Sequence, residues 1–212
     1  MKIKFIIKEQ SLLYFTKWED ILVNVFDKAT ADRIPYDELT KLGLKYLGNG
    51  AFRTVYSFPD NEDIVLKVCQ NIEDADMNEV EANPRMQTKY ALIVPKTFIR
   101  ADDYRWIVME RVRPIPDLWE LNRILPDFKL FLNSVREYAD EDTVIDSVKK
   151  VMQKMGVKRI SPTLNALIDF CIEYNVAISE LREKNMGITK DGRVVVLDAS
   201  VLGPWQHAKH EI

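Results

Sequence analysis

The pattern of the chain changes near residue 112, and this change constrains the fold more than any other feature of the sequence. Before it, short runs of β-branched, aromatic and other apolar residues alternate with turn signals, which predicts an antiparallel sheet. The five runs cover residues 44–47, 54–58, 64–68, 97–99 and 106–109. After it, apolar residues recur at helical spacing, and the predicted helices cover residues 117–124, 127–139, 143–155 and 162–174. We therefore expect an α+β fold with a sheet-forming first lobe and a helical second lobe.

One further helix is expected within the strand-forming part of the chain. Residues 73–90 are polar and mostly helix-forming, so we expect them to supply the single helix of that lobe. Pro84 falls within this stretch, and because proline lacks an N–H and clashes with the preceding turn, the helix must kink or end there. The first lobe is thus expected over residues 43–112 and a reduced helical lobe over residues 113–212.

Residues 1–42 form an extension that precedes these lobes. An amphipathic helix is predicted over residues 11–28, because apolar residues recur there at intervals of three and four: Leu12, Phe15, Trp18, Ile21, Leu22 and Val25. Residues 2–7 read as a short strand and residues 36–42 as one helical turn. We expect the extension to pack on the first lobe rather than to form a separate binding element.

The composition argues against several classes of protein. The 212 residues are 47% hydrophobic, which argues against disorder, and the formal net charge of −3 gives no overall positive field for nucleic acid. No run of about eighteen apolar residues occurs, so we expect a cytoplasmic protein without a membrane span. Cys69 and Cys171 are the two cysteines, and the apolar surroundings of Cys69 favour buried free thiols over a disulfide.

A glycine-rich stretch lies between the first two predicted strands. Gly48, Asn49 and Gly50 fall in the sequence Leu-Gly-Asn-Gly-Ala-Phe. Glycines lack a Cβ and so let backbone N–H groups approach phosphate oxygens, and Phe52 would then cap the tip of the loop. The alternative is a plain hairpin turn, because Asn-Gly also suits two-residue hairpins.

Lys67 interrupts the apolar run 64–69, where a cation needs a partner. Phosphate oxygens and a glutamate of the following helix are the partners that we expect. Glu81 is the first candidate and Glu79 the second, since both lie in that helix. The alternative is an edge-strand lysine that points into solvent.

A second polar pair lies near the end of the sequence. Asp198 directly follows the apolar residues 194–197, and Asn185 precedes them. A carboxylate at the mouth of a buried strand costs desolvation energy unless a metal or a hydrogen-bond donor meets it. Amide and carboxylate oxygens suit hard cations, so we expect a magnesium site. The alternative for Asp198 is a turn cap that leads into Ala199 and Ser200.

Together these fragments resemble the protein-kinase-like superfamily. Gly48, Gly50 and Val55 fit the pattern G-x-G-x-x-G-x-V, with Arg53 in place of the third glycine. Ile64-Val65-Leu66-Lys67 stands at the place of the V-A-I-K strand.

The end of the chain carries the other half of the resemblance. Asn185 fits the catalytic-loop asparagine and Asp198 the D-F-G aspartate, with Ala199-Ser200 in place of Phe-Gly. Where kinases carry His-Arg-Asp, this chain carries Ile178-Ser179-Glu180. Within the superfamily the chain is most similar to the compact early Ser/Thr protein kinases of T-seven-type bacteriophages.

The resemblance implies a bilobal kinase fold that binds ATP and Mg2+ and phosphorylates Ser or Thr of proteins. It places around the nucleotide Gly48, Asn49, Gly50, Phe52, Val55, Lys67, Glu81, Glu110 and Val112. It assigns the metal to Asn185 and Asp198. It assigns catalysis to Lys67, to Glu180 at the place of the catalytic aspartate, and to Arg182 at the place of the lysine that neutralises the transferring phosphate. A protein substrate or partner, such as the host transcription machinery, is also implied.

Other functions stay open beside the protein kinase. Arg53, Glu180 and Ala199 depart from the kinase pattern and favour a pseudokinase, a kinase-like module that binds a partner protein without catalysis. Retention of Lys67 and Asp198 favours an enzyme. RIO-type atypical kinases are the nearest other enzymes, and a small-molecule kinase of the aminoglycoside type is a weaker alternative because those usually carry a larger helical lobe.

Overall fold

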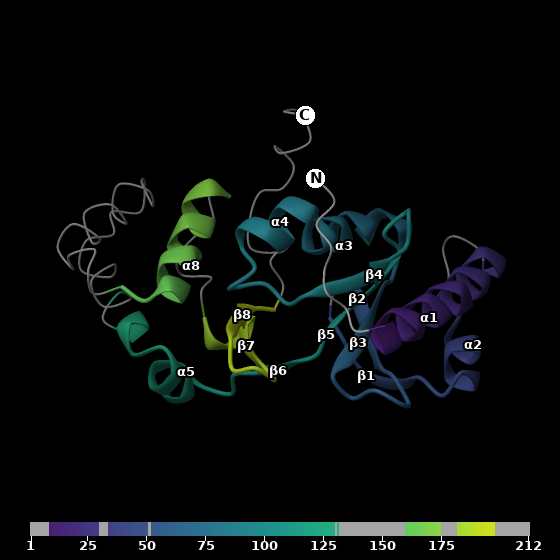
Figure 1. Cartoon of the computed structure of the whole chain (residues 1–212), viewed down its shortest axis with the longest axis horizontal. Coiled ribbons are helices and arrows are strands. Elements are labelled where there is room, and N and C mark those ends of the chain that lie inside the picture. The colour runs from purple at the N-terminus through teal and green to yellow at the C-terminus, as the bar shows by residue number, and fades with distance from the viewer. Residues whose placement is uncertain are drawn as a thin grey trace. The chain divides into compact units, whose positions relative to one another are not determined.

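The computed structural model describes residues 9–29, 34–50, 52–129, 131, 160–174 and 182–197. Its largest sheet has five antiparallel strands in the order β1-β2-β3-β5-β4 (Figure 1). The strands are β1 (Lys45–Asn49), β2 (Arg53–Ser57), β3 (Ile64–Cys69), β4 (Thr97–Arg100) and β5 (Trp106–Glu110). The five strands predicted from the sequence are confirmed, each within two residues of its expected bounds.

Helix α1 (Glu9–Lys28) packs on one face of this sheet, and α2 (Tyr36–Lys41) follows it. Because side chains alternate along a strand, Leu66 and Val68 point to the same face. There they share a core with four aromatic and aliphatic side chains of α1, which are Phe15, Trp18, Leu22 and Phe26. The expectation that the extension packs on the first lobe is confirmed, whereas the strand predicted over residues 2–7 lies outside the described residues.

The opposite face of the sheet meets α3 (Ala75–Ala82), which follows the short 3-10 helix η1 (Ile72–Asp74). A second helix, α4 (Pro84–Lys89), begins directly after it. Pro84 occupies the first turn of α4, and the Asn83 side chain caps that helix by accepting a hydrogen bond from the Arg85 N–H at 2.8 Å. The predicted helical stretch is therefore divided at the proline into α3 and α4, because proline has no N–H to continue the first helix.

The second part of the chain contains a small sheet of which the sequence analysis predicted only one strand, the buried run that precedes Asp198. Its antiparallel strands lie in the order β6-β7-β8 and are β6 (Val112–Pro114), β7 (Met186–Thr189) and β8 (Val194–Val196). β7 and β8 form a hairpin whose turn contains Gly192 at a φ of 85°. β6 is joined to this hairpin only through partners more than seventy residues away, such as Thr189 opposite Val112. A strand of three residues with a distant partner leaves no local periodicity to detect.

Two predicted helices of this part are confirmed, α5 (Leu118–Ile124) and α8 (Pro162–Glu173). Asp117 caps α5 by accepting from the Glu120 N–H, and Ser161 caps α8 by accepting from the Leu164 N–H. The predicted helix over 127–139 is described only as far as residue 131, and the one over 143–155 lies outside the described residues.

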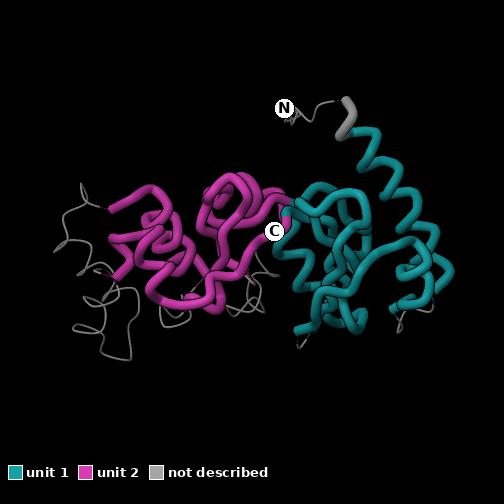
Figure 2. Tube along the Cα trace, turned by 90° about the horizontal axis from the view of Figure 1, so that it is seen from below, with its two compact units in different colours: residues 1–82, 97–110 teal, residues 83–96, 111–212 magenta. Residues whose placement is uncertain are grey.

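The chain divides into two compact units (Figure 2). The first unit comprises residues 1–82 and 97–110, and the second comprises residues 83–96 and 111–212. This division differs from the boundaries drawn from the sequence, because residues 83–96 belong with the second unit although they lie between strands of the first. Both cysteines are buried and free. Among the described helices, none is long and apolar enough to cross a membrane.

Candidate functional site

Lys67 and Glu81 form a buried ion pair on the face of the sheet that meets α3. The Lys67 Nζ lies 2.9 Å from the Glu81 Oε2, and the exposed fractions of the two side chains are 12% and 4%. The structure thus places Glu81 against the lysine, the first of the two glutamates considered, and it excludes the solvent-facing alternative for Lys67. A cation within an apolar strand is stable here because a carboxylate of the next helix meets it.

Arg53 is the second cation on Glu81, and the sequence analysis missed this role. Its Nη1 lies 2.8 Å from the Glu81 Oε1, and its side chain is 6% exposed. Arg53 stands where the third glycine was expected, but its side chain lies in the interior and not over the loop. The signal that could have found it is the strand register: Val55 lies opposite Lys67, and Arg53, two positions earlier, shares the face of Val55.

Asn78 completes this buried network and was also missed. Its side chain is 0% exposed, and its Nδ2 donates to the Tyr104 carbonyl oxygen at 2.8 Å and to the Cys69 Sγ at 3.1 Å. Its Oδ1 accepts from the Arg53 Nη1 at 3.5 Å. Burial raises the pKa of the Cys69 thiol to about 12, so the sulfur accepts this hydrogen bond as a neutral thiol at neutral pH.

An apolar core cluster lies beside the ion pair on the same face. Val65 and Met109 are buried there, and Val55 packs against their cluster while remaining partly exposed. Glu110 ends β5 and is half-buried, whereas Val112 begins β6 in the second unit.

The glycine-rich stretch forms the β1–β2 hairpin. The Gly50 N–H donates to the Arg53 carbonyl oxygen at 2.9 Å, which closes the turn. Gln70 makes hydrogen bonds to two residues of this turn. Its side-chain Nε2 donates to the Gly50 carbonyl oxygen at 2.9 Å, and its backbone N–H donates to the Phe52 carbonyl oxygen at 2.8 Å. Asn49 accepts a hydrogen bond from the Tyr46 hydroxyl at 2.6 Å. Phe52 is 37% exposed at the tip, as its expected position there requires.

Gly48 and Gly50 have open space where a side chain would begin. A Cβ added to either would find no atom within 4 Å. Neither glycine has a positive φ, unlike Gly43 and Gly192. Neither a neighbouring atom nor a positive φ therefore requires glycine at positions 48 and 50, and the register of β1 against β2 shifts between Tyr46 and Gly48.

Asn185 ends the 3-10 helix η4 (Glu183–Asn185), which leads into β7 of the second unit. Its carbonyl oxygen accepts from the Leu197 N–H at 2.9 Å, so the segment before Asp198 lies beside η4. Arg182 precedes η4 and is exposed. Asp198 and Glu180 lie outside the described residues, so their predicted roles stay predictions.

The donor set expected for magnesium fits the chemistry of that ion. An amide oxygen and a carboxylate are hard oxygen ligands, and Mg2+ is held through a few such groups together with phosphate oxygens and water. Within the described ranges, no group of three or more His, Cys, Asp or Glu side chains forms another candidate metal site.

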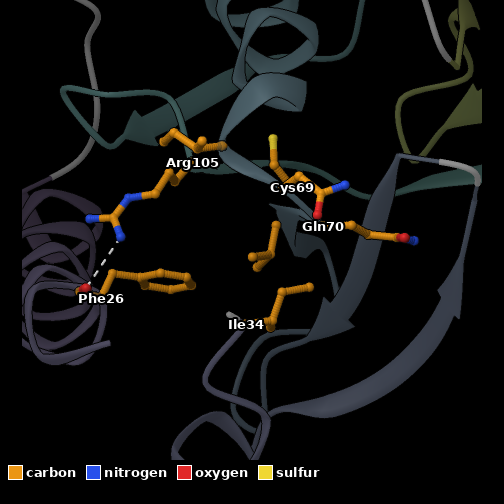
Figure 3. Close-up of a pocket in the computed structure, with 8 residues that line it drawn as sticks. Phe26, Ile34, Cys69, Gln70 and Arg105 are labelled. Carbon is orange, nitrogen blue, oxygen red and sulfur yellow. Dashed lines mark hydrogen bonds between the residues drawn. The ribbon is translucent and has the colours of Figure 1, made fainter. Parts of the chain in front are cut away.

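A small hollow that is open to solvent lies elsewhere in the first unit (Figure 3). Phe26, Ile34, Cys69, Gln70 and Arg105 line it together with Val68, Asn71 and Ile72. The Arg105 Nη1 reaches across it to the Phe26 carbonyl oxygen at 3.4 Å. Its lining includes neither Lys67 nor Glu81, so it is separate from the buried ion pair.

No protein-family model matches the chain, and no curated protein matches its sequence. Among solved structures, it is similar to the GDP and kanamycin complex of APH(2'')-IIIa, with a TM-score of 0.40 and 10% identity over 87% of this chain and 72% of that one. A second is the GDP complex of a mutant of aminoglycoside 2'-phosphotransferase-IIIa, with a TM-score of 0.35 and 9% identity over the same shares.

Proposed function

We propose that this protein is a kinase-like phosphotransferase that uses ATP and Mg2+. The observation that supports this most is the buried Lys67–Glu81 pair between β3 and α3, beside the apolar cluster that contains Val55 and Val65. Phosphoryl transfer needs a cation held in place for the phosphates more than it needs covalent chemistry from the protein. A lysine fixed by a helix glutamate meets that need.

Each predicted residue then has one task. Lys67 binds phosphate oxygens, Gly48 and Gly50 let the hairpin approach them, and Val55 with Val65 covers the base. The backbone around Glu110 and Val112 meets the polar edge of the base. Asn185 and Asp198 hold the magnesium ion, which neutralises charge on the phosphates. Glu180 accepts the proton of the acceptor hydroxyl, and Arg182 offsets the charge that the transferring group carries.

The acceptor in this proposal is a Ser or Thr hydroxyl of a protein. The proposal rests on the resemblance to compact phage kinases, and it includes proteins of the host transcription machinery as substrates. A small-molecule acceptor is the alternative outcome of a substrate screen.

Nucleotide binding provides the first test. Mg-ATP at about a hundred times its Kd should raise the free energy of unfolding by about 2.7 kcal/mol, measured as an upward shift in the thermal melt. Lys67→Ala should reduce the shift, and Asp198→Ala should remove its dependence on magnesium. A melt that millimolar Mg-ATP leaves unchanged contradicts the proposal.

A second candidate, a kinase-like binding module without catalysis, is favoured by one observation. The Gly50 N–H is engaged by the Arg53 carbonyl oxygen within the hairpin, so in this conformation it does not face a phosphate. In that case the protein would bind a partner protein and bind nucleotide weakly or not at all.

Phosphoryl transfer from labelled ATP separates the two candidates through Glu180. Glu180→Gln should keep ATP binding and abolish transfer to the protein itself or to a bacterial lysate, because the amide keeps the shape but cannot accept the proton. Glu180→Asp should keep or raise the rate, since a misplacement of about 1 Å can cost on the order of a hundredfold. If neither the wild type nor Glu180→Asp transfers phosphate, the binding module is the better description.

A further inference from the structure

The buried network around Glu81 assigns Arg53 a role of its own. We infer that Arg53 is a positioning residue that holds the Glu81 carboxylate against Lys67, so that the chain itself keeps α3 in the phosphate-binding arrangement without an activating modification or partner. This inference rests on the proposed nucleotide-binding function and specifies how that site is assembled.

The carboxylate of Glu81 is held at both oxygens. Its Oε1 lies 2.8 Å from the Arg53 Nη1, and its Oε2 lies 2.9 Å from the Lys67 Nζ. A carboxylate with a single partner can rotate or swing away, but one bridged between two cations has its direction fixed. Arg53 therefore determines which oxygen of Glu81 faces the lysine.

Arg53 also fixes the helix that carries Glu81. Its guanidinium contacts two residues one turn apart on α3, Glu81 and Asn78. Asn78 in turn donates to the Tyr104 carbonyl oxygen and to the Cys69 Sγ. The helix is thus attached to β2, to the end of β3 and to Tyr104, two residues before β5, through side chains of Arg53 and Asn78 that are almost fully buried.

This attachment makes an outward position of α3 costly. Moving the helix away would separate Glu81 from two buried cations at once, and a buried charge that loses its partner is strongly destabilised. Helices that act as switches have two positions of similar free energy. Here the second cation favours one of them, which explains why a charged side chain occupies a position where the kinase pattern has glycine.

The test compares the affinities of wild-type protein and variants for ATP and for adenosine by calorimetry below the melting temperature. Arg53→Met should weaken Mg-ATP binding about tenfold, because Glu81 then keeps only one of its two ion-pair partners. Adenosine binding should change by less than about twofold, because Lys67 contacts phosphate and not the base. If Arg53 had only a structural role, Arg53→Met would lower the melting temperature but would not change the affinity for ATP more than the affinity for adenosine.

Two further variants keep the test decisive if Arg53→Met folds poorly. Arg53→Lys keeps a cation that can reach one oxygen, and it should retain ATP affinity within about threefold. The double variant Arg53→Met/Glu81→Gln avoids an unpaired buried carboxylate, and it should bind ATP within about twofold of Glu81→Gln alone, since Arg53 acts through Glu81. Arg105→Met is the matched control, because Arg105 pairs with Asp103 in the same unit and should leave ATP affinity unchanged.

Three results would overturn the inference. Unchanged ATP affinity in a folded Arg53→Met protein would do so, as would equal losses for ATP and adenosine, or a loss that adds fully to that of Glu81→Gln. In each case the wild type still binds ATP, so the proposed function stands. A wild-type protein that binds neither ligand would instead overturn the function and this inference together.

Discussion

At the scale of single residues, Gly48 and Gly187 are two strand glycines with different surroundings. A Cβ at Gly48 would have no neighbour within 4 Å. A Cβ at Gly187 would lie 2.3 Å from the Val112 Cγ1 and 2.9 Å from the Arg113 carbonyl oxygen. Packing between β6 and β7 therefore requires glycine at 187, whereas nothing in the described structure requires it at 48.

Substituting both glycines separates a ligand requirement from a folding requirement. Gly48→Ala should leave stability unchanged or raise it by about 0.4–1 kcal/mol, because alanine restricts the unfolded chain, but it should weaken ATP binding. Gly187→Ala should cost roughly 1–3 kcal/mol through overpacking. Denaturant unfolding and ATP titration measure the two effects. If Gly48→Ala binds ATP as tightly as the wild type, this glycine has no role in approaching phosphate.

The same residues show what the sequence could and could not predict about the site. The need of Lys67 for a partner was predictable, since a cation within an apolar run must be met and the next helix offered two glutamates. The roles of Arg53 and Asn78 were not. Arg53 depends on the pairing of β2 with β3, a register that no local pattern specifies, and Asn78 depends on which side of α3 packs on the sheet.

At the scale of elements, Glu173 joins α8 to α4. Its Oε1 lies 2.5 Å from the Arg85 Nη2, and its Oε2 accepts from the Lys89 Nζ and the Tyr90 hydroxyl. Burial by itself would raise the pKa of this carboxyl, but the hydrogen bonds from Lys89 and Tyr90 and the charges of Lys89 and Arg85 outweigh it and lower the pKa. The contact between these two helices is therefore sensitive to acid.

A pH series should reveal this sensitivity. A carboxyl whose pKa is lower in the folded state stabilises the fold above its unfolded pKa of about 4.3 and loses that contribution as the pH falls through the folded value. Glu173→Gln should thus lower the melting temperature at pH 7, and its difference from the wild type should shrink below about pH 4. Glu19→Gln, on the exposed face of α1, is the matched control for removing one carboxylate charge. A Glu173→Gln difference that is constant with pH contradicts the assignment.

Elements differed in how well the sequence predicted them. Those with strong local signals were predicted closely, such as α8, with its serine cap, first-turn proline and apolar stripe of Leu164, Leu167 and Ile168. β6 was not predicted, because three residues carry no periodicity and its partner strand comes from the far end of the described chain.

At the scale of the whole molecule, the sequence showed two parts but not how the chain is shared between them. The change of pattern near residue 112 marks the passage at Glu110–Arg111, where the first unit ends. It does not show that the chain passes into the second unit at residue 83 and returns to the first unit at residue 97. Residues 83–96 belong to the second unit because of contacts with residues far along the chain. The Ile93 carbonyl oxygen accepts a hydrogen bond from the Val196 N–H, and the carbonyl oxygens of Ala91 and Val94 accept hydrogen bonds from the Arg193 side chain.

This sharing of the chain has a consequence for biosynthesis. All parts of the first unit precede Arg111, so it can fold while the ribosome is still translating the second. Residues 83–96 emerge in the middle of that process, yet Arg193, which binds Ala91, follows 102 residues later. At about 5–20 residues per second, this delay lasts roughly 5–20 s. During that time, residues 83–96 are connected at both ends to the first unit but lack their partners from the second unit.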